Sequence, residues 1–521
     1  MKNLKDVKAK LLANPAVRQA YDAQAPEFEL ARELIAARTQ AGLTQGDVAA
    51  RMGTTQSVVA RIESGRGTPS MRTVQRFASA VGARAVVRMV PRASPPQINL
   101  ALMEDMVKVA FSQRRKLLRH TLGRWLETKT SESVYNPWSG DKLAEVCTGS
   151  AEDVERAVAS AHSAFQKTRK IPAFERAEKL NAICDFLAKR RQEFVDVIVA
   201  EAGKPVSFAE AEVDRARLTF QFAAAQVLAD PGHGINMEAS KPGAGHFGLV
   251  RRFPIGVILG ITPFNFPLNL VAHKVAPCLA SGNTMVLKPS PRTPLSALLL
   301  AEVLDEAGIP AGQVNVIPFD HSHVAGLLSD LRLKMLSFTG SAEVGWQLKS
   351  RAGKMKVALE LGGNAAVVVE SDSDWRAAVP KSASAAFGFA GQSCISVQRI
   401  FVNREILEPF REALVSHTQE KIRAGDPSQR DTVVGPMITS QAREKVLKWI
   451  EEATAGGASL LTPLVKEGRS LLGPVLLENA PSSASALCEE AFAPLAVLQG
   501  YDTFEEALAL VNDSHFGLQA G

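Results

Sequence analysis

The chain has 521 residues, a hydrophobic fraction of 46% and a mean hydropathy of zero. It shows no run of about 18 apolar residues and no signal-peptide pattern, so we expect a globular protein without a membrane span. Its five cysteines are far apart and form no CxxC pair, which argues against a disulfide framework or a zinc site and indicates a reducing cytoplasm. Residues 1–130 carry 22 Lys and Arg against 10 Asp and Glu, whereas the rest carries 38 against 44, so a basic head precedes a mildly acidic body.

The head has the pattern of several short helices. Apolar residues recur there at helical spacing, and Thr44 followed by Asp47 has the spacing of a capping box. Two short helices around a glycine turn are typical of a helix-turn-helix. We expect helices over residues 27–40, 44–52, 55–65 and 69–82, and a strand over 85–90.

The stretch LTQGDVAARMGTTQSVVARIESGRGTPSMRTVQRFASAVG, residues 43–82, resembles the Cro/C1-type helix-turn-helix domains, and among them the HigA-like antitoxins. This resemblance implies a DNA-binding domain over residues 1–95, with a cognate toxin as a further partner. It also implies a phosphate contact from Gln45 and a recognition helix facing the major groove. A glutamine amide can bond an adenine edge and an arginine can pair with guanine or phosphate, whereas the alternative is a solvated polar helix face. The recognition-helix residues are Thr55, Gln56, Ser57 and Arg61.

Residues 96–129 form a separate basic segment. The stretch MEDMVKVAFSQRRKLLRHTLGRWLE, residues 103–127, predicts an amphipathic helix, and it resembles the C-terminal tail of the ribosomal RNA adenine dimethyltransferases. Nothing upstream resembles the methyl-donor-binding domain of that family, so we infer no methyltransferase activity. We interpret residues 96–129 as a linker helix with a solvated charged face.

From Tyr135 onward the chain alternates helices with buried strands. Residues 151–228 are strongly helical, and the later apolar runs predict strands. Such an alternation indicates an α/β fold with a parallel sheet covered on both faces, which binds ligands at the carboxyl ends of its strands. The expected strands lie in GLVRRFPIGVILGITPFNFP, GNTMVLKPS, QVNVIPF, KMLSFTG and AAVVVE.

Three local motifs in the body each have a functional and a plain interpretation. SFTGSAEVG places Gly340 and Ser341 at a helix N-terminus, which suits a phosphate, although many loops look alike. VLKPS ends a strand with Lys288, which could reach a ribose or a phosphate or be merely solvated. LELGGN sets Glu360 among apolar residues, where we expect a desolvated general base; the alternative is an ion-paired structural glutamate.

The stretch FAGQSCISVQ, residues 389–398, places Cys394 after a Gly-Gln pair and between two hydroxyls. A structural cysteine needs no such setting, whereas a nucleophile needs backbone room, access and neighbours that favour the thiolate. The motifs TPFNFP with Asn265, GNTMVLKPS, FTGS, ELGG, GQSC and CEEAFAP follow one another in this order. In this respect residues 130–521 resemble the aldehyde dehydrogenase superfamily, and Glu360 precedes Cys394 by the expected 34 positions.

The resemblance implies an aldehyde dehydrogenase fold, with a Rossmann-like cofactor-binding part over 130–362 and a catalytic part over 363–521. It implies NAD or NADP as the cofactor and a small aldehyde as the substrate. Cys394 would be the nucleophile, Asn265 an oxyanion donor and Glu360 the base. The residues implied in cofactor binding are Lys288, Gly312, Gly340 and Ser341 at the adenosine and pyrophosphate, and Glu490 and Phe492 at the nicotinamide ribose.

The resemblance also places Gly391 close to the nicotinamide, and Ser393 and Ile395 along the aldehyde tunnel. Pro291 stands where family members often carry an acidic residue that bonds the ribose 2′-hydroxyl, so the sequence does not choose between NAD and NADP. The family continues beyond NDSHFGLQAG, and we therefore expect a C-terminally incomplete catalytic part that forms a homo-oligomer only when completed. Two alternatives stay open, a transcription regulator with a non-catalytic body and a chain of joined fragments.

Overall fold

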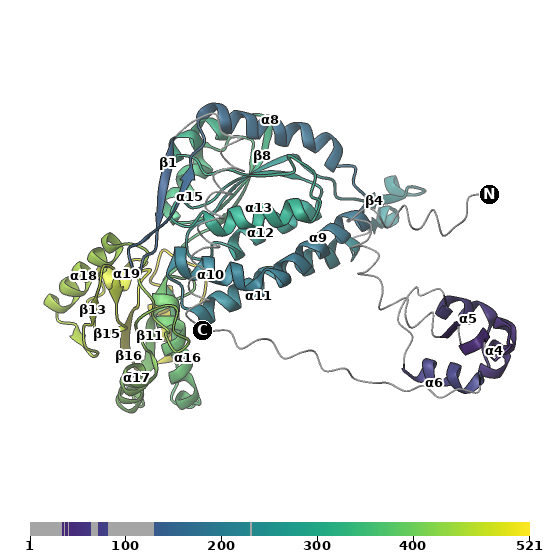
Figure 1. Cartoon of the computed structure of the whole chain (residues 1–521). Coiled ribbons are helices and arrows are strands. Elements are labelled where there is room, and N and C mark those ends of the chain that lie inside the picture. The colour runs from purple at the N-terminus through teal and green to yellow at the C-terminus, as the bar shows by residue number, and fades with distance from the viewer. Residues whose placement is uncertain (1–33, 36, 40, 64–70, 82–129, 230–231) are drawn as a thin grey trace. The chain divides into compact units, whose positions relative to one another are not determined.

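The computed structural model describes residues 34–35, 37–39, 41–63, 71–81, 130–229 and 232–521. The chain divides into two compact units, residues 1–105 and 106–521, each of which is described by itself (Figure 1). Most of the expected first helix, the expected strand over 85–90 and the expected linker helix lie outside the described residues. The boundaries expected at 95, 129 and 362 stay predictions.

Among its described residues, the first unit contains short helices around a small apolar core. Thr44 caps the first of them, because its side chain accepts the N–H of Asp47 while the Asp47 carboxylate accepts the Thr44 N–H at 2.8 Å. Gly53 adopts a left-handed φ of 62° and ends this helix, so the expected capping box and glycine turn are confirmed. Leu34, Val48, Met52, Val59 and Phe77 are among the buried residues that pack these helices together. The helices are α4 (Gln45–Met52), α5 (Gln56–Glu63) and α6 (Met71–Ala80).

The second unit, the body, confirms the predicted alternation of helices and parallel strands. Its helices are α8 (Ala151–Thr168), α9 (Ala173–Lys189), α10 (Arg191–Ala202), α11 (Val206–Ala229), α12 (Asn269–Ala280), α13 (Leu295–Glu306), α14 (Val324–Leu328), α15 (Ala342–Arg351), α16 (Trp375–Phe387), α17 (Leu407–Lys421), α18 (Ser440–Ala455), α19 (Ser485–Cys488) and α20 (Phe504–Asn512). Its 3₁₀ turns are η1 (Met237–Ala239), η2 (Lys241–Gly243), η3 (His321–His323) and η4 (Gly388–Gly391).

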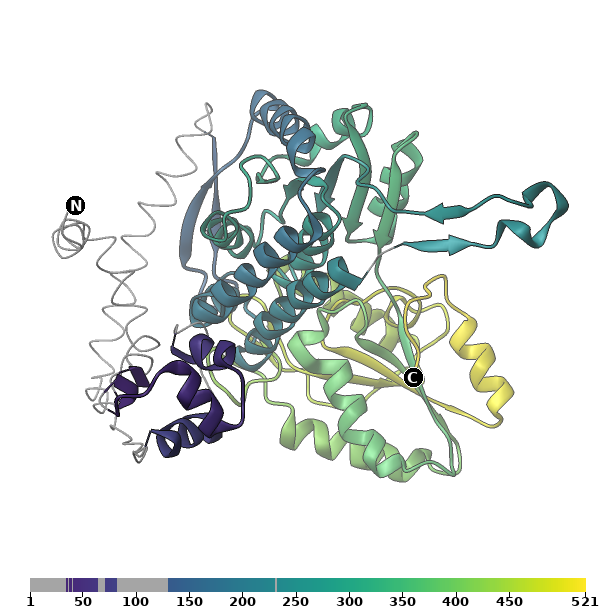
Figure 2. The same cartoon turned by 90° about the vertical axis from the view of Figure 1, so that its right-hand side faces the viewer.

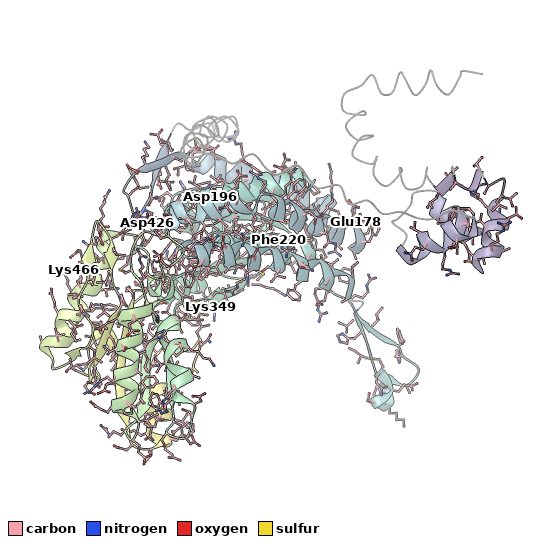
Figure 3. All side chains as sticks on the ribbon, turned by 60° about the horizontal axis from the view of Figure 1, so that its bottom comes forward. Glu178, Asp196, Phe220, Lys349, Asp426 and Lys466 are labelled. Atoms are coloured by element: carbon pink, nitrogen blue, oxygen red, sulfur yellow. The ribbon has the colours of Figure 1, made fainter. Side chains whose placement is uncertain are left out.

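A five-stranded parallel sheet forms the first half of the body, in the order β7-β6-β5-β8-β9. Alternate residues of β5 and β6 point to opposite faces, so Ile258 and Met285 pack under α9 to α13 while Leu259 and Val286 pack under α8 and α14. Phe220 of α11, labelled in Figure 3, is fully buried in the helical layer. The strands are β5 (Val257–Ile261), β6 (Thr284–Lys288), β7 (Val314–Val316), β8 (Leu333–Thr339) and β9 (Lys356–Glu360).

A second five-stranded sheet, in the order β10-β11-β16-β15-β12, forms the other half. Its pairs are parallel except for β12 with β15. The expected strand AAVVVE therefore lies in this second sheet and not in the first. Helices α16 and α17 cover one face of the second sheet, and α18 and α19 cover the other. The strands are β10 (Ala365–Val369), β11 (Val397–Asn403), β12 (Ser459–Leu460), β15 (Val475–Glu478) and β16 (Leu495–Tyr501).

Three antiparallel ribbons complete the body. The pair β3–β4 projects away from the rest of this unit (Figure 2). Among the residues that the structure describes, none of the helices is long and apolar enough to cross a membrane. The ribbons are β1 (Ser131–Tyr135) with β2 (Lys142–Cys147), β3 (His233–Ile235) with β4 (Gly248–Val250), and β13 (Lys466–Glu467) with β14 (Leu471–Leu472).

Candidate active site

Cys394 lies in the turn between η4 and β11, and it is half-buried. The backbone leading to it is unusual, because Phe389, Ala390 and Gly391 have φ values of 52°, 54° and 64°. A Cβ atom on Gly391 would lie 1.9 Å from the carbonyl oxygen of Ala493. The close approach that requires this glycine is therefore made by the protein's own backbone, whereas the sequence suggested the nicotinamide.

Asn265 follows β5 and is held next to the cysteine turn. Its side chain is 3% exposed, and Nδ2 donates to the carbonyl oxygen of Gln392 at 3.0 Å. The Gln392 side chain is itself fixed, since its Oε1 accepts the N–H of Ile438 at 2.9 Å and its Nε2 donates to Pro436 at 3.3 Å. The Asn265 amide is thus bonded to the residue two positions before Cys394, and it keeps one N–H for a further acceptor.

Glu490 approaches the same turn from the second sheet's side. Its Oε1 accepts the N–H of Gly363 at 3.2 Å, and a Cβ atom on Gly362 would lie 2.1 Å from its Oε2. A Cβ atom on Gly363 would lie 2.5 Å from the carbonyl oxygen of Cys394. The two glycines therefore let the link between β9 and β10 pass between Glu490 and the cysteine turn. Burial raises the pKa of Glu490, against the effects of the Gly363 N–H and of Lys445.

The surroundings of Cys394 disfavour ionisation of its thiol. Burial and the carboxylates of Glu490 and Glu360 raise its pKa, while its own N–H and that of Ile395 act in the opposite direction. The expectation that its neighbours favour the thiolate is not met. A positive charge brought next to Cys394 would reverse this balance.

Glu360 is not desolvated as the sequence suggested. It is the last residue of β9 and is exposed. The reason is its place in the sheet, because β9 is an edge strand with β8 as its one neighbour. Glu360 pairs with Thr339 of β8 at the carboxyl end of the sheet, where its carboxylate acts on both Lys274 and Cys394.

The carboxyl ends of β6 and β8 bring Lys288, Gly340 and Ser341 to one edge of the first sheet. Lys288 is 7% exposed, and burial lowers the pKa of its ammonium against the attraction of Asp320 and Glu132. Ser341 is the N-cap of α15 but makes no side-chain cap, so the first N–H groups of this helix are open to an anion. A buried cation and an uncapped helix start fit the phosphates and ribose of a dinucleotide.

Gly312 does not reach this edge. It precedes β7, whose Val314 pairs with Met285 near the start of β6, so Gly312 lies at the amino end of the parallel strands. A Cβ atom there would lie 2.6 Å from Oγ of Ser160, and the left-handed φ of 82° also favours glycine. Packing against α8 therefore accounts for this glycine. Its assignment to the cofactor is wrong in that Gly312 does not lie at the edge of the sheet that carries Lys288, Gly340 and Ser341.

Phe492 lies against the loop that carries Asn265. Its ring and that of Phe264 meet edge to face, with centroids 5.7 Å apart. Phe492 has a positive φ of 45°, which turns the chain two residues after Glu490. Of the two residues assigned to the nicotinamide ribose, Glu490 thus contacts the link between β9 and β10, and Phe492 contacts the loop that carries Asn265.

Lys274 was missed by the sequence analysis. It is 6% exposed on α12, and its Nζ donates to Oγ1 of Thr339 at 2.8 Å and to Oγ of Ser337 at 3.2 Å. Burial lowers its pKa to about 8, against the attraction of Glu360. A single lysine inside the apolar stretch NLVAHKVAPCLA was the signal that could have found it.

In the first unit, Thr55, Gln56 and Ser57 lie together and exposed at the start of α5. The hydroxyls of Thr55 and Ser57 are 2.9 Å apart. Gln45 opens α4 and is half-buried, while the side chain of Arg61 lies outside the described part. The structure therefore presents a polar helix start, as the expected recognition helix requires.

Two family models match the chain: one described as the aldehyde dehydrogenase family over residues 125–521, and one described as a helix-turn-helix domain over residues 29–88. A 3-sulfolactaldehyde dehydrogenase of Priestia aryabhattai is 38% identical over 77% of this chain and 83% of its own length.

Two solved structures have the same fold as the body. A glyceraldehyde-3-phosphate dehydrogenase of Methanocaldococcus jannaschii, complexed with NADP, has a TM-score of 0.71 and 32% identity over 75% of this chain and 85% of its own. An NAD-dependent aldehyde dehydrogenase of Sinorhizobium meliloti has a TM-score of 0.72 and 32% identity over 76% of this chain and 79% of its own.

Proposed function

The chain belongs to the aldehyde dehydrogenase family of NAD(P)-dependent oxidoreductases, and we propose that its body oxidises a small aldehyde to a carboxylic acid through a thioester on Cys394. The observation that carries this proposal is the hydrogen bond from Asn265 to Gln392. It holds an amide donor beside Cys394, a half-buried cysteine with the carboxylates of Glu490 and Glu360 near it.

In the first step, the Cys394 thiol loses its proton to solvent, and the thiolate sulfur attacks the carbonyl carbon of the aldehyde to form a thiohemiacetal alkoxide. The free N–H of the Asn265 amide and the N–H of Cys394 donate to this oxygen, which stabilises the negative charge that develops there. Collapse of the alkoxide expels a hydride and leaves a thioester on sulfur. The oxidised nicotinamide ring, when bound, supplies the hydride acceptor and a positive charge near the thiol.

In the second step, Glu360 takes a proton from a water molecule that attacks the thioester carbonyl. The carboxylic acid leaves, and the sulfur of Cys394 takes up a proton. The exposed position of Glu360 supports this role, because its carboxylate can then pass the proton to bulk water. Lys288, Gly340 and Ser341 would hold the phosphates and ribose of the cofactor, and Glu490 and Phe492 its nicotinamide ribose.

Single-turnover and steady-state kinetics of the full chain test these roles. Cys394→Ala should abolish aldehyde oxidation and leave cofactor binding intact, whereas Cys147→Ala on β2 serves as the matched control. Glu360→Gln should release one reduced cofactor per site in a burst and then stall, because acylation needs no water. A Glu360→Gln variant with wild-type turnover would show that another group activates the water.

We further propose that the head binds a palindromic DNA site as a dimer, with an antitoxin-type function alongside a cognate toxin. The helix-turn-helix match and the exposed start of α5 support this proposal. In the full chain, Gln56→Ala should relax base preference, whereas Gln45→Ala should weaken all sequences about equally. Gln75→Ala on α6 is the control. Binding that shows no sequence preference at any salt concentration would contradict the proposal.

A further inference from the structure

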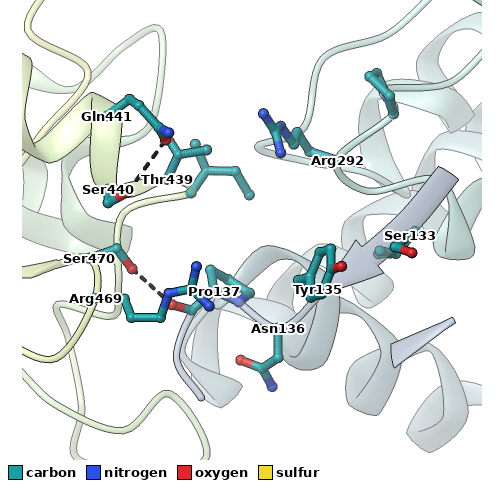
Figure 4. Close-up of a pocket in the computed structure, with 13 residues that line it drawn as sticks. Ser133, Tyr135, Asn136, Pro137, Arg292, Thr439, Ser440, Gln441, Arg469 and Ser470 are labelled. Atoms are coloured by element: carbon teal, nitrogen blue, oxygen red, sulfur yellow. Dashed lines mark hydrogen bonds between the residues drawn. The ribbon is translucent and has the colours of Figure 1, made fainter. Parts of the chain in front are cut away.

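A cavity of about 270 Å³ lies within the body, away from the cysteine turn. Its walls come from both halves, since the segment at β1 and the loop after β6 face the start of α18 and the loop before β14 (Figure 4). The residues that line it are Ser133, Val134, Tyr135, Asn136, Pro137, Pro291, Arg292, Ile438, Thr439, Ser440, Gln441, Arg469 and Ser470.

The lining has a one-sided charge. It includes two arginines, Arg292 and Arg469, and no carboxylate. Figure 4 shows the two guanidinium groups extending into the space from different walls. Among the described residues, neither guanidinium has an ion-pair or hydrogen-bond partner, although most other arginines of the body are paired. Two unpaired cations facing one cavity favour a multivalent anion, because guanidinium groups pair best with phosphate or carboxylate oxygens.

Local structure fixes the backbone beside both arginines and leaves room for their side chains. A Cβ atom on Gly140 would lie 2.7 Å from Nη1 of Arg469, so the absence of a side chain there lets the guanidinium lie over this turn. The turn itself is fixed, because Ser470 Oγ donates to the carbonyl oxygen of Pro137 at 2.8 Å. Arg292 follows Pro291, and its N–H donates to Ser290 Oγ at 3.2 Å.

The start of α18 adds neutral donors to the same wall. Thr439 is its N-cap and accepts the N–H of Ala442 at 3.1 Å, which leaves the N–H groups of Ser440 and Gln441 without a helical acceptor. This helix has 16 residues, so its N-terminal end adds a favourable field for an anion.

From these contacts we propose that the cavity is a second binding site, separate from the dehydrogenase centre, that takes a phosphate group carried by inorganic phosphate or by a small phosphate monoester. The volume limits the ligand to this size, because sites for drug-sized ligands are typically about 300–1,000 Å³. A bound phosphate would bridge Arg292 of one half of the body to Arg469 and α18 of the other.

The same bridge reaches both loops of the active site through single hydrogen bonds. On one wall, Thr293 next to Arg292 donates to the carbonyl oxygen of Phe264 at 3.3 Å, directly before Asn265. On the other wall, the N–H of Ile438 donates to the side chain of Gln392. Phosphate binding therefore fixes the distance between the two halves at the point where they carry the oxyanion donor and the cysteine turn.

Isothermal titration of the full chain with inorganic phosphate, at constant ionic strength against chloride, tests the site. We expect saturable binding that is weakened about tenfold or more by Arg292→Gln and by Arg469→Gln, the order expected for one charge-assisted hydrogen bond. Arg376→Gln on α16, an exposed arginine whose guanidinium lies 4.2 Å from the Trp375 ring, should bind phosphate as the wild type does. A parallel titration with glycerol phosphate distinguishes a monoester from the free ion as the better ligand.

Three results would overturn the proposal. The first is the absence of saturable binding of either phosphate compound. The second is equal weakening by Arg376→Gln, which would indicate a general effect of net charge. The third is competition between phosphate and NADP, which would place the anion in the cofactor site. Both arginines are exposed and unpaired among the described residues, so the variants should melt at the wild-type temperature without phosphate and remain interpretable.

Discussion

Replacing Glu212 by glutamine should destabilise the body more than any surface charge change. Glu212 and Lys204 form an ion pair in which both side chains are 0% exposed. Glu212 Oε1 also accepts the N–H groups of Leu268 at 2.9 Å and of Asn269 at 3.0 Å. These two residues lie at the start of α12, just after the Asn265 loop. The Glu212→Gln variant keeps one acceptor oxygen but leaves a buried ammonium without its counter-ion.

The ammonium of Lys204 lies between the two loops of the active site. Its Nζ is 3.6 Å from the ring centroid of Phe266 and 4.3 Å from that of Phe389. Phe389 belongs to η4, which precedes Cys394. These rings would still attract the cation after the change, and the ammonium can also lose its proton, since burial already lowers its pKa to about 8. Both effects limit the loss.

Removing one partner of a buried pair costs about 3–5 kcal/mol. The unfolding entropy of a body of this length is about 0.8 kcal/mol per kelvin, so the melting temperature should fall by about 4–6 °C. Activity per folded molecule should fall as well, because the same pair connects the Asn265 loop and η4.

Calorimetry of Glu212→Gln, Lys204→Met and the double variant forms the assay. The double variant should lose less than the two single losses together, since it buries no unpaired charge. Asp502→Asn is the matched control, because its ion pair with Arg404 at 2.8 Å has side chains 65% and 56% exposed and should cost less than about 1 kcal/mol. Additive losses, or a Glu212→Gln loss no larger than that of Asp502→Asn, would refute the reasoning.

Three further changes have defined outcomes. Burial raises the pKa of Glu201 from 4.5 to about 7, so its contribution to stability is complete below pH 4.5 and is lost as the pH rises through 7. Melting scans from pH 5 to pH 8 should therefore show the wild type losing stability relative to Glu201→Gln. Asn265→Ala removes one oxyanion donor and should slow hydride release in stopped-flow measurements by on the order of a hundredfold, with unchanged cofactor affinity as the check on folding. Thr44→Ala removes the cap of α4 and should destabilise the first unit by about 1 kcal/mol in denaturant titrations while the melting of the body stays unchanged.

Local patterns predicted those parts of the fold that depend on near neighbours in the chain. The capping box at Thr44 and Asp47 is contained in four residues, and the structure shows it as expected. The apolar runs around Leu259 and Val286 predicted buried parallel strands, because strands covered on both faces have no polar side to alternate with. The order of the motifs also located Asn265 and Cys394, which the structure brings together through Gln392.

Features that depend on position within a sheet could not be predicted in this way. Glu360 and Gly312 both lie in suggestive local sequences, but their environments follow from strand order and register. Glu360 is exposed because β9 is an edge strand, and Gly312 lies at the wrong end because it precedes β7. The buried pair of Lys204 and Glu212 escaped notice for a similar reason, since its partners Phe266 and Phe389 are distant in sequence.

The glycines around Cys394 separate the demands of folding from those of chemistry. A side chain at Gly391 or at Gly362 would collide with atoms of Ala493 or Glu490, whereas replacing Cys394 by alanine only removes its sulfur atom. A lineage that gave up aldehyde oxidation but still needed a folded body would therefore lose the cysteine while retaining both glycines. Among descendants of such a chain, retained glycines report inheritance of the fold, and the cysteine alone reports inheritance of the reaction.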